Sequence, residues 1–190
     1  MTLTINEVAE QLLANKVGIF PADTIYGLTC LPTKEAIEAL YVIKQRQKNH
    51  PFLMILPGLE AVKKWVDPLT VEQETTLKRY WPGPFTFILN KKATVNDLIT
   101  AGKPTIAIRV PDFQPVMKLL ETVKQPLLST SVNVSGQASI TDLTCLDDQF
   151  RKKIDFCFDS ISPLYGVEST LVDLTVNPFK VIRQGVKTFE

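Results

Sequence analysis

The sequence Phe52-Leu53-Met54-Ile55-Leu56 is a continuous apolar run, and Pro57-Gly58 closes it. An apolar run of this length without polar alternation is typical of a strand that is buried on both faces. Such strands occur where helices cover a sheet on both sides. The run therefore predicts an α/β layer fold.

Helix and strand patterns alternate along the chain on both sides of this run. Thr4, Thr33 and Thr70 each stand where an N-cap would open an apolar helical pattern, and Pro115 lies in the first turn of another helix. Short helices are also expected at 59–65 and after Thr141, and a loop at 22–28. Further strands are expected at 17–20, 85–89, 105–110, 127–128, 156–158, 169–174 and 181–183. The pattern favours a mixed sheet flanked by helices in one domain, residues 1–190.

Composition limits the class of protein. Of 190 residues 45% are hydrophobic, and the formal net charge is +1, which argues against a strongly basic nucleic-acid binder. The three cysteines are scattered without a CxxC pair, which argues against a disulfide framework and a zinc site. The N-terminus does not look like a signal peptide, and no apolar stretch approaches a membrane span. We expect a cytoplasmic protein without a membrane partner.

Several catalytic signatures are absent from the sequence. It contains neither the GxxxxGK[ST] phosphate loop nor a GxGxxG fingerprint. His50 is the single histidine, so HExxH and multi-histidine metal sites are excluded, and no GxSxG elbow supports a serine triad. A site in this chain would therefore act by positioning and polarising its ligands.

The segment Ser129-Thr130-Ser131-Val132-Asn133-Val134-Ser135-Gly136 is the most informative polar stretch. It follows Leu127-Leu128, so we expect a strand that runs out into a polar loop. Its small side chains and many donors and acceptors would let a ligand approach closely. The alternative is an ordinary loop, because these residues also bond to their own backbone.

Other polar groups stand at the expected ends of strands and helices. Residues 44–50 form a basic run, either a phosphate or carboxylate clamp or a solvated helix end. Residues 22–28 follow a predicted strand, and open α/β sheets bind ligands at the ends of their strands. The alternative is that these residues form a simple turn. Glu168 stands just before a strand and could pair with a basic residue for structural reasons, and Arg183 is not far downstream. Alternatively, Ser169 could offer a hydroxyl to a ligand. Arg109 lies within an apolar strand and must face a partner or a polar cleft.

Together these groups could line one cleft for a polyanionic nucleotide and a small polar substrate. Seven ordered motifs resemble the YrdC-like threonylcarbamoyl-AMP synthases, in the short bacterial form without an additional C-terminal domain. They are PADTIYGL at 21–28, KQR at 44–46, WPGPFT at 81–86, AIRVP at 107–111, STSVNVSG at 129–136, GVEST at 166–170 and IRQG at 182–185. The resemblance covers about residues 17–185.

The resemblance implies a twisted, open, mixed α/β sheet with a concave, positively charged cleft. It also implies a nucleotidyltransferase that forms L-threonylcarbamoyladenylate and pyrophosphate from L-threonine, bicarbonate and ATP. Mg²⁺ would accompany ATP, with no resident metal and no tightly bound organic cofactor. The product would pass to tRNA threonylcarbamoyl-transfer proteins for modification of adenosine 37. Weak binding of tRNA or other RNA is part of this expectation.

Site roles follow from the resemblance alone, position by position. No residue is expected to act as a nucleophile, and Lys44 and Arg46 are expected to stabilise charge. The ATP side is expected to comprise Lys44, Arg46, His50, Thr105, Ser131, Asn133, Ser139 and Arg183. The threonine side is expected to comprise Thr24, Arg109, Ser129 and Ser169, with Arg109 pairing with the threonine carboxylate.

The chain departs from the family pattern at three places. Ala22 replaces a threonine, Gln47 replaces a proline, and His50 stands where an asparagine is frequent. None of these changes removes a charged group of the expected clamp. An RNA-binding or ribosome-maturation module remains the alternative function. A relative of the carbamoyl transferases that mature hydrogenases is disfavoured, because the zinc-finger cysteines and accessory domains are missing.

Overall fold

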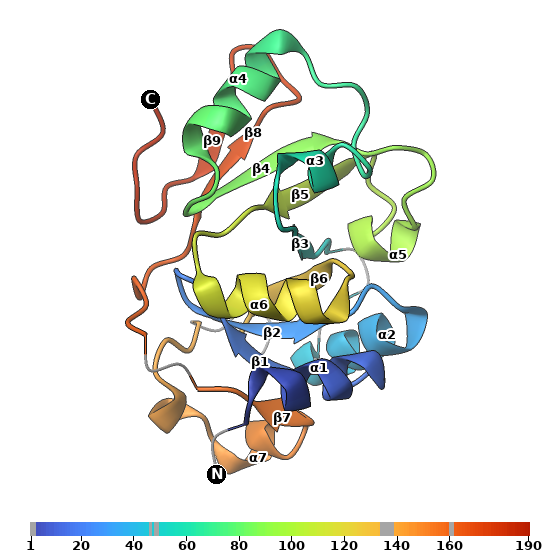
Figure 1. Ribbon diagram of the computed structural model, residues 1–190, viewed down its shortest axis with the longest axis vertical. Coiled ribbons are helices and arrows are strands. Elements are labelled where there is room, and N and C mark those ends of the chain that lie inside the picture. Colours follow the sequence, from blue (N-terminus) through green and yellow to red (C-terminus); the bar gives the residue numbers. More distant parts are fainter. Residues whose placement is uncertain (1–2, 46, 48–49, 134–138, 160–161) are drawn as a thin grey trace.

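The computed structural model describes the chain except residues 1–2, 46, 48–49, 134–138 and 160–161. Its described part forms a nine-stranded mixed sheet in the order β7-β1-β2-β6-β3-β5-β4-β8-β9, with β7 at the bottom of Figure 1 and β9 near the top. The strands are β1 (Gly18–Pro21), β2 (Tyr26–Cys30), β3 (Leu53–Ile55), β4 (Phe85–Asn90), β5 (Thr105–Arg109), β6 (Leu127–Ser131), β7 (Phe156–Cys157), β8 (Thr170–Asp173) and β9 (Lys180–Arg183). The two edge strands do not pair with each other, so the predicted open α/β sheet is confirmed.

The helices begin largely where the sequence places their caps. The side chains of Thr4, Thr33 and Thr70 accept hydrogen bonds from backbone N–H groups of α1, α2 and α4, and the first and third of these caps are complete capping boxes. Pro115 lies in the first turn of α6, as expected. The described helices are α1 (Ile5–Leu13), α2 (Lys34–Lys44), α3 (Leu59–Val62), α4 (Val71–Tyr80), α5 (Asp97–Thr100), α6 (Gln114–Val123) and α7 (Asp148–Arg151).

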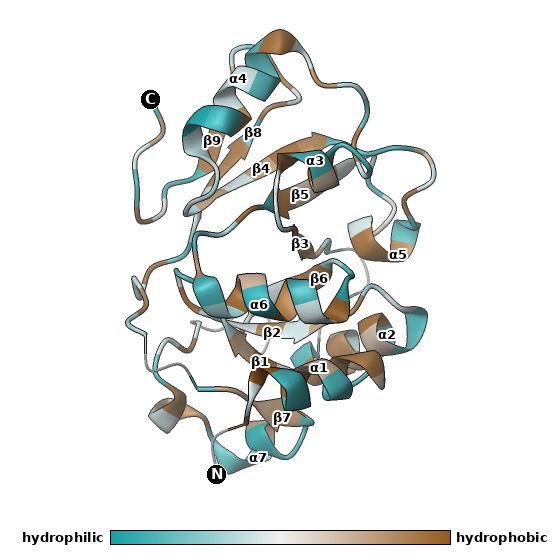
Figure 2. Ribbon diagram, in the orientation of Figure 1, coloured by the Kyte–Doolittle hydropathy of each residue, from teal (hydrophilic) through white to brown (hydrophobic). Residues whose placement is uncertain are grey.

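Alternation along the strands separates a large core from a second face. Met54, Ile108 and Phe87 point into the large core, which α2 and α4 help to cover with Leu40 and Leu77. Figure 2 shows apolar colour on β3 and β5 of the sheet and hydrophilic colour over much of α4.

The opposite face of the sheet is only partly covered. Helices α1 and α6 pack there on Ile55 and Leu127, together with Phe20 of β1. Leu53 points to the same face and packs against this cluster, but it is only half-buried. The prediction that the 52–56 run is buried on both faces is therefore wrong at Leu53. The uncovered part of this face is where a ligand can approach the sheet.

Some predicted boundaries also need correction. The loop expected over 22–28 is shorter, because Tyr26 already pairs with Pro21 and β2 continues to Cys30. The helix expected after Thr141 is a 3₁₀ turn at Leu143–Cys145 followed by the one-turn helix α7. Helix α5, which Asn96 caps, was not predicted, because its four residues are too few to show an apolar period. Within the described residues, no helix is long and apolar enough to cross a membrane.

A buried ion pair joins the hairpin of β1 and β2 to the middle of the sheet. The Asp23 carboxylate, in the turn between these strands, accepts from Nη2 of Arg109 at 2.5 Å. The two side chains are only 7% and 3% exposed. Either charge alone in this position would be strongly destabilising, so the turn and β5 depend on each other.

Asp23→Ala should therefore lower the free energy of unfolding by about 3–5 kcal/mol, because it leaves the Arg109 charge buried without its carboxylate. Urea denaturation followed by circular dichroism measures the loss. The control is Glu60→Ala, which removes a carboxylate that is 86% exposed and pairs with Lys63, itself 41% exposed. That variant should lose less than about 1 kcal/mol. Equal losses in the two variants would contradict a structural role for the buried pair.

Candidate active site

The uncovered face of the sheet is the floor of a cavity of about 530 Å³. Sheet register places two rows of side chains across it. One row runs through Ser129, Leu53, Ala107 and Ile88, and the next through Ile55, Arg109, Thr86, Leu171 and Arg183. All of these residues line the cavity. The first row is therefore mainly apolar, whereas the second carries the polar side chains of Arg109, Thr86 and Arg183.

At one end of the cavity the last residue of α2, Lys44, meets the end of β6. Helix α2 stops there because Gln45 adopts a left-handed conformation. The Lys44 ammonium is buried and donates to the Ser131 carbonyl at 2.7 Å and to Oδ1 of Asn133 at 2.5 Å. The Ser131 hydroxyl donates to the same Asn133 oxygen at 2.9 Å. Three residues predicted for the ATP side are thus brought together as one cation with two polar neighbours.

At the other end Arg109 is the central group. Besides its bond to Asp23, it donates from Nη1 to the Thr24 hydroxyl at 2.6 Å and from Nε to the Gly83 carbonyl at 3.3 Å. Burial lowers the pKa of Arg109 from its ordinary value, and the Asp23 carboxylate opposes that change. Thr24 and Arg109, both predicted for the threonine side, therefore form one unit. The guanidinium is oriented by protein groups before any substrate arrives.

Two buried hydroxyls lie beside this unit. Ser169, directly before β8, and Thr86 of β4 have their hydroxyl oxygens 2.7 Å apart. The pairing of Phe85 with Thr170 brings the two segments together. Ser169 was predicted for the threonine side, whereas Thr86 was missed. Its alternation with the core residue Phe87 was the signal that could have identified it.

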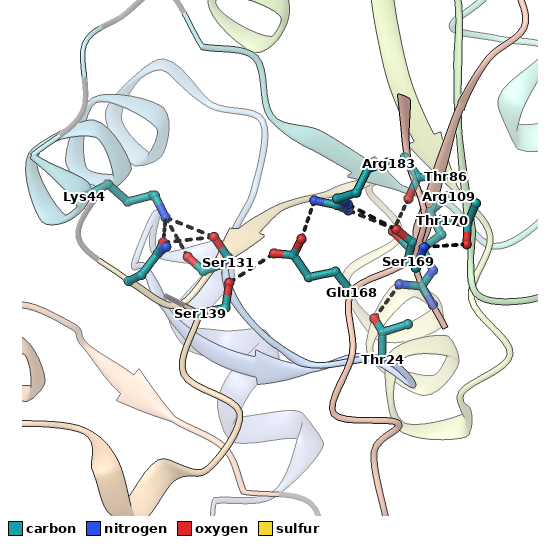
Figure 3. A network of polar contacts seen from close by, with 12 residues as sticks. Thr24, Lys44, Thr86, Arg109, Ser131, Ser139, Glu168, Ser169, Thr170 and Arg183 are labelled. Carbon is teal, nitrogen blue, oxygen red and sulfur yellow. Dashed lines mark hydrogen bonds and ion pairs between the residues drawn. The ribbon is translucent and has the colours of Figure 1, made fainter. Parts of the chain in front are cut away.

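A third polar group stands on the wall formed by β9 and the segment before β8. Arg183 donates from Nη2 to the Ser169 carbonyl at 3.0 Å, and its Nη1 lies 2.5 Å from a Glu168 carboxylate oxygen. The other Glu168 oxygen accepts from the Ser139 hydroxyl at 3.0 Å. Figure 3 shows Glu168 between the Lys44 group and the Arg183 group. The expected pairing of Glu168 with a base is confirmed.

The structure does not gather every predicted residue. His50, Thr105 and Ser139 are not among the described residues that line the cavity, although Ser139 contacts the lining residue Glu168. His50 is exposed, and its carbonyl accepts from Tyr41. Thr105 shares its face of β5 with Ala107 and Arg109 but lies at the start of the strand. Arg46 lies outside the described residues. Lys103, which precedes β5, lines the cavity and was missed, because loop lysines carry no periodic signal.

The cavity combines cations with hydroxyl groups over an apolar floor. Its described lining includes four cationic side chains, Lys44, Lys103, Arg109 and Arg183, and the carboxylate of Glu168. Ammonium and guanidinium groups bind phosphate and carboxylate, and hydroxyls orient a polar substrate. The described residues hold no group of three His, Cys, Asp or Glu side chains placed to bind a metal ion. The arrangement suits negatively charged substrates, whose reaction the site would promote by positioning them and neutralising their charge.

The chain is similar to known proteins over most of its length. The family model for Sua5, YciO and YrdC proteins, described as telomere recombination, matches residues 10–185. A threonylcarbamoyl-AMP synthase of Pyrococcus abyssi is 33% identical over 90% of the chain and 50% of its own length. One of Vibrio vulnificus is 32% identical over 81% of the chain and 84% of its own length.

A solved structure also matches the fold. The crystal structure of Pyrococcus abyssi Sua5 complexed with L-threonine has a TM-score of 0.89 and 32% identity over 95% of the chain. The chain covers 54% of that structure, so it spans about half the length of the Pyrococcus relatives. Because the family match extends over nearly all of the sequence, the chain belongs to the Sua5/YciO/YrdC family.

Proposed function

We propose that the chain is an L-threonylcarbamoyladenylate synthase, which converts L-threonine, bicarbonate and ATP into threonylcarbamoyl-AMP and pyrophosphate. The observation that carries the proposal is the two-ended cavity, with Lys44, Ser131 and Asn133 at one end and Thr24, Arg109 and Ser169 at the other. Relatives named threonylcarbamoyl-AMP synthase and a homologous structure with L-threonine bound support it.

The Lys44 end suits the nucleotide. When the carbamate oxygen attacks the α-phosphorus of ATP and pyrophosphate leaves, negative charge must be neutralised along the phosphates. Lys44 is a buried ammonium oriented by Ser131 and Asn133, so it needs little reorganisation to meet that charge. We assign the same role to Arg46, the last residue of the KQR motif at 44–46, and to Arg183, which also lines the cavity.

The Arg109 end suits threonine. Thr24, Ser129 and Ser169 are buried hydroxyl-bearing residues that line the cavity around a fixed guanidinium. Such groups can orient an amino acid through its carboxylate and its own hydroxyl. Leu53, Ile88 and Leu171 also line the cavity. Their apolar surface would protect the carbamate formed from amine and bicarbonate, which is labile in water.

We further propose that Mg²⁺ enters bound to ATP and that the product serves tRNA modification in the cytoplasm. The lining of cations and hydroxyls fits phosphate oxygens better than a bare metal ion, so a metal would be held mainly by the nucleotide. Downstream tRNA threonylcarbamoyl-transfer proteins would accept the adenylate. A primary RNA-binding role has less support, since the net charge of +1 offers little general attraction to phosphate backbones.

The wild-type protein should release pyrophosphate from ATP only when L-threonine and bicarbonate are both present. A coupled phosphate assay after pyrophosphatase, with each substrate omitted in turn, measures this dependence. L-alanine in place of L-threonine is the control for recognition of the side-chain hydroxyl. Equal ATP turnover with and without threonine would contradict the proposal. Tight RNA binding at physiological salt without that turnover would favour the RNA-binding alternative.

Lys44→Met should lower kcat for pyrophosphate release by ~10²-fold or more, because it removes a preorganised positive charge from the phosphate site. Arg46→Ala should cause a similar loss. The matched control is Lys78→Met on α4, whose side chain is 65% exposed and pairs with Glu74. The control should keep wild-type kinetics. Unchanged kinetics in Lys44→Met, in a variant with a wild-type circular dichroism spectrum, would remove Lys44 from the reaction.

A further inference from the structure

Glu168 is the one acidic side chain among the described residues that line the cavity. Its carboxylate uses both oxygens for protein partners, Ser139 at 3.0 Å and Arg183 at 2.5 Å. Ser139 lies near the end of β6, because the N–H of its neighbour Ile140 donates to the Val132 carbonyl at 2.9 Å. Arg183 belongs to β9 at the edge of the sheet. The carboxylate therefore links the segment after β6 to β9, and Figure 3 shows it between Ser139 and Arg183.

The backbone holds Glu168 and Arg183 next to each other. The Glu168 carbonyl accepts from the N–H of Val186 at 3.1 Å, and the Thr170 hydroxyl accepts from the N–H of Gly185 at 3.0 Å. A Cβ at Gly185 would overlap the Glu168 carbonyl oxygen and the backbone between Ser169 and Thr170. Only glycine allows the two segments to approach this closely. The ion pair is therefore built into the packing of β9 on the segment before β8.

The side chains of this pair are nevertheless accessible from the cavity. The exposed fraction is 32% for the Glu168 side chain and 44% for the Arg183 side chain. A half-exposed pair of this kind contributes little to stability, so its partners can be exchanged at small cost. Arg183 also donates to the Ser169 carbonyl from two nitrogens, Nε and Nη2. These bonds keep the guanidinium in place when its carboxylate partner is exchanged.

We propose that Glu168 is a replaceable counter-ion of Arg183. It orients the guanidinium in the free cavity and is displaced when a phosphate group of the nucleotide binds Arg183. This inference rests on the proposed function, in which Arg183 contacts ATP. In the free cavity Glu168 neutralises and orients the guanidinium. A phosphate that binds Arg183 must displace this carboxylate or share the cation with it. Glu168 thereby weakens the binding of ATP and of the product pyrophosphate, and it favours release of the product.

Glu168→Gln tests the proposal, because the amide keeps the size of the side chain and removes its charge. Isothermal titration calorimetry should give Kd values for ATP and for pyrophosphate that are lower than wild type by about 5-fold, the scale of one partly exposed ion pair. In steady-state assays the KM for ATP should fall, the KM for threonine should stay unchanged, and inhibition by pyrophosphate should strengthen. Unchanged or weaker binding of ATP would overturn the proposal.

The matched control is Glu74→Gln. The Glu74 side chain is also 32% exposed and pairs with Lys63 and Lys78, but it lies on α4 and not in the lining of the cavity. This variant changes the net charge of the protein by the same amount. It should keep the wild-type Kd for ATP. Equal tightening in both variants would show a general charge effect and would overturn the specific role of Glu168.

A double-mutant cycle tests whether Glu168 acts through Arg183. Arg183→Met should weaken ATP binding, and Glu168→Gln should produce no tightening in the Arg183→Met background. Tightening that persists without Arg183 would mean that the carboxylate repels phosphate directly, which would overturn the counter-ion role. The wild-type assays separate this inference from the proposed function. Calorimetric binding of ATP without threonine-dependent pyrophosphate release would refute the synthase and leave the counter-ion test intact, whereas no ATP binding would refute both.

Discussion

The buried pair of Asp23 and Arg109 is the interaction on which the site depends. The two residues are 86 positions apart in the sequence, and their bond fixes the β1–β2 turn against the central strand β5. Burial of a guanidinium is unfavourable unless its donors have partners, and Asp23, Thr24 and Gly83 provide them. A charge that would disrupt an ordinary core is thereby held at one end of the cavity.

The cavity exists because the two faces of the sheet are covered to different extents. On the large-core face the helices leave the central strands fully buried, whereas α1 and α6 cover only part of the other face. The remaining part carries Leu53, Ala107 and Ile88 from three adjacent strands. The ends of neighbouring segments add the polar groups around this apolar floor. The position of the site is thus a property of the helix arrangement, and its chemistry is a property of the strand ends.

Local signals predicted much of the architecture, because caps and apolar periods act over a few residues. Thr4, Thr33 and Thr70 mark helix starts correctly. The half-exposed position of Leu53 could not be predicted, because it depends on which helices reach that face. The motif resemblance did place Lys44 with Ser131 and Asn133, and Thr24 with Arg109. The partners within the site, such as Asp23 with Arg109 and Thr86 with Ser169, arise from long-range register, which the order of residues alone does not reveal.

The alternation of side chains along β3 and β5 determines which residues of these strands can be substituted without loss of the fold. Met54 and Ile108 belong to the hydrophobic core, while their immediate neighbours Leu53 and Ala107 form the floor of the cavity. Substitution of a floor residue alters the shape offered to a substrate and leaves the adjoining core contact intact. Insertion of a single residue would turn the core residues toward the cavity and the floor residues toward the core. The length of these strands is therefore constrained, whereas the identity of the floor residues is not. Adaptation to a new substrate and maintenance of the fold are therefore separable along the same few residues of one strand.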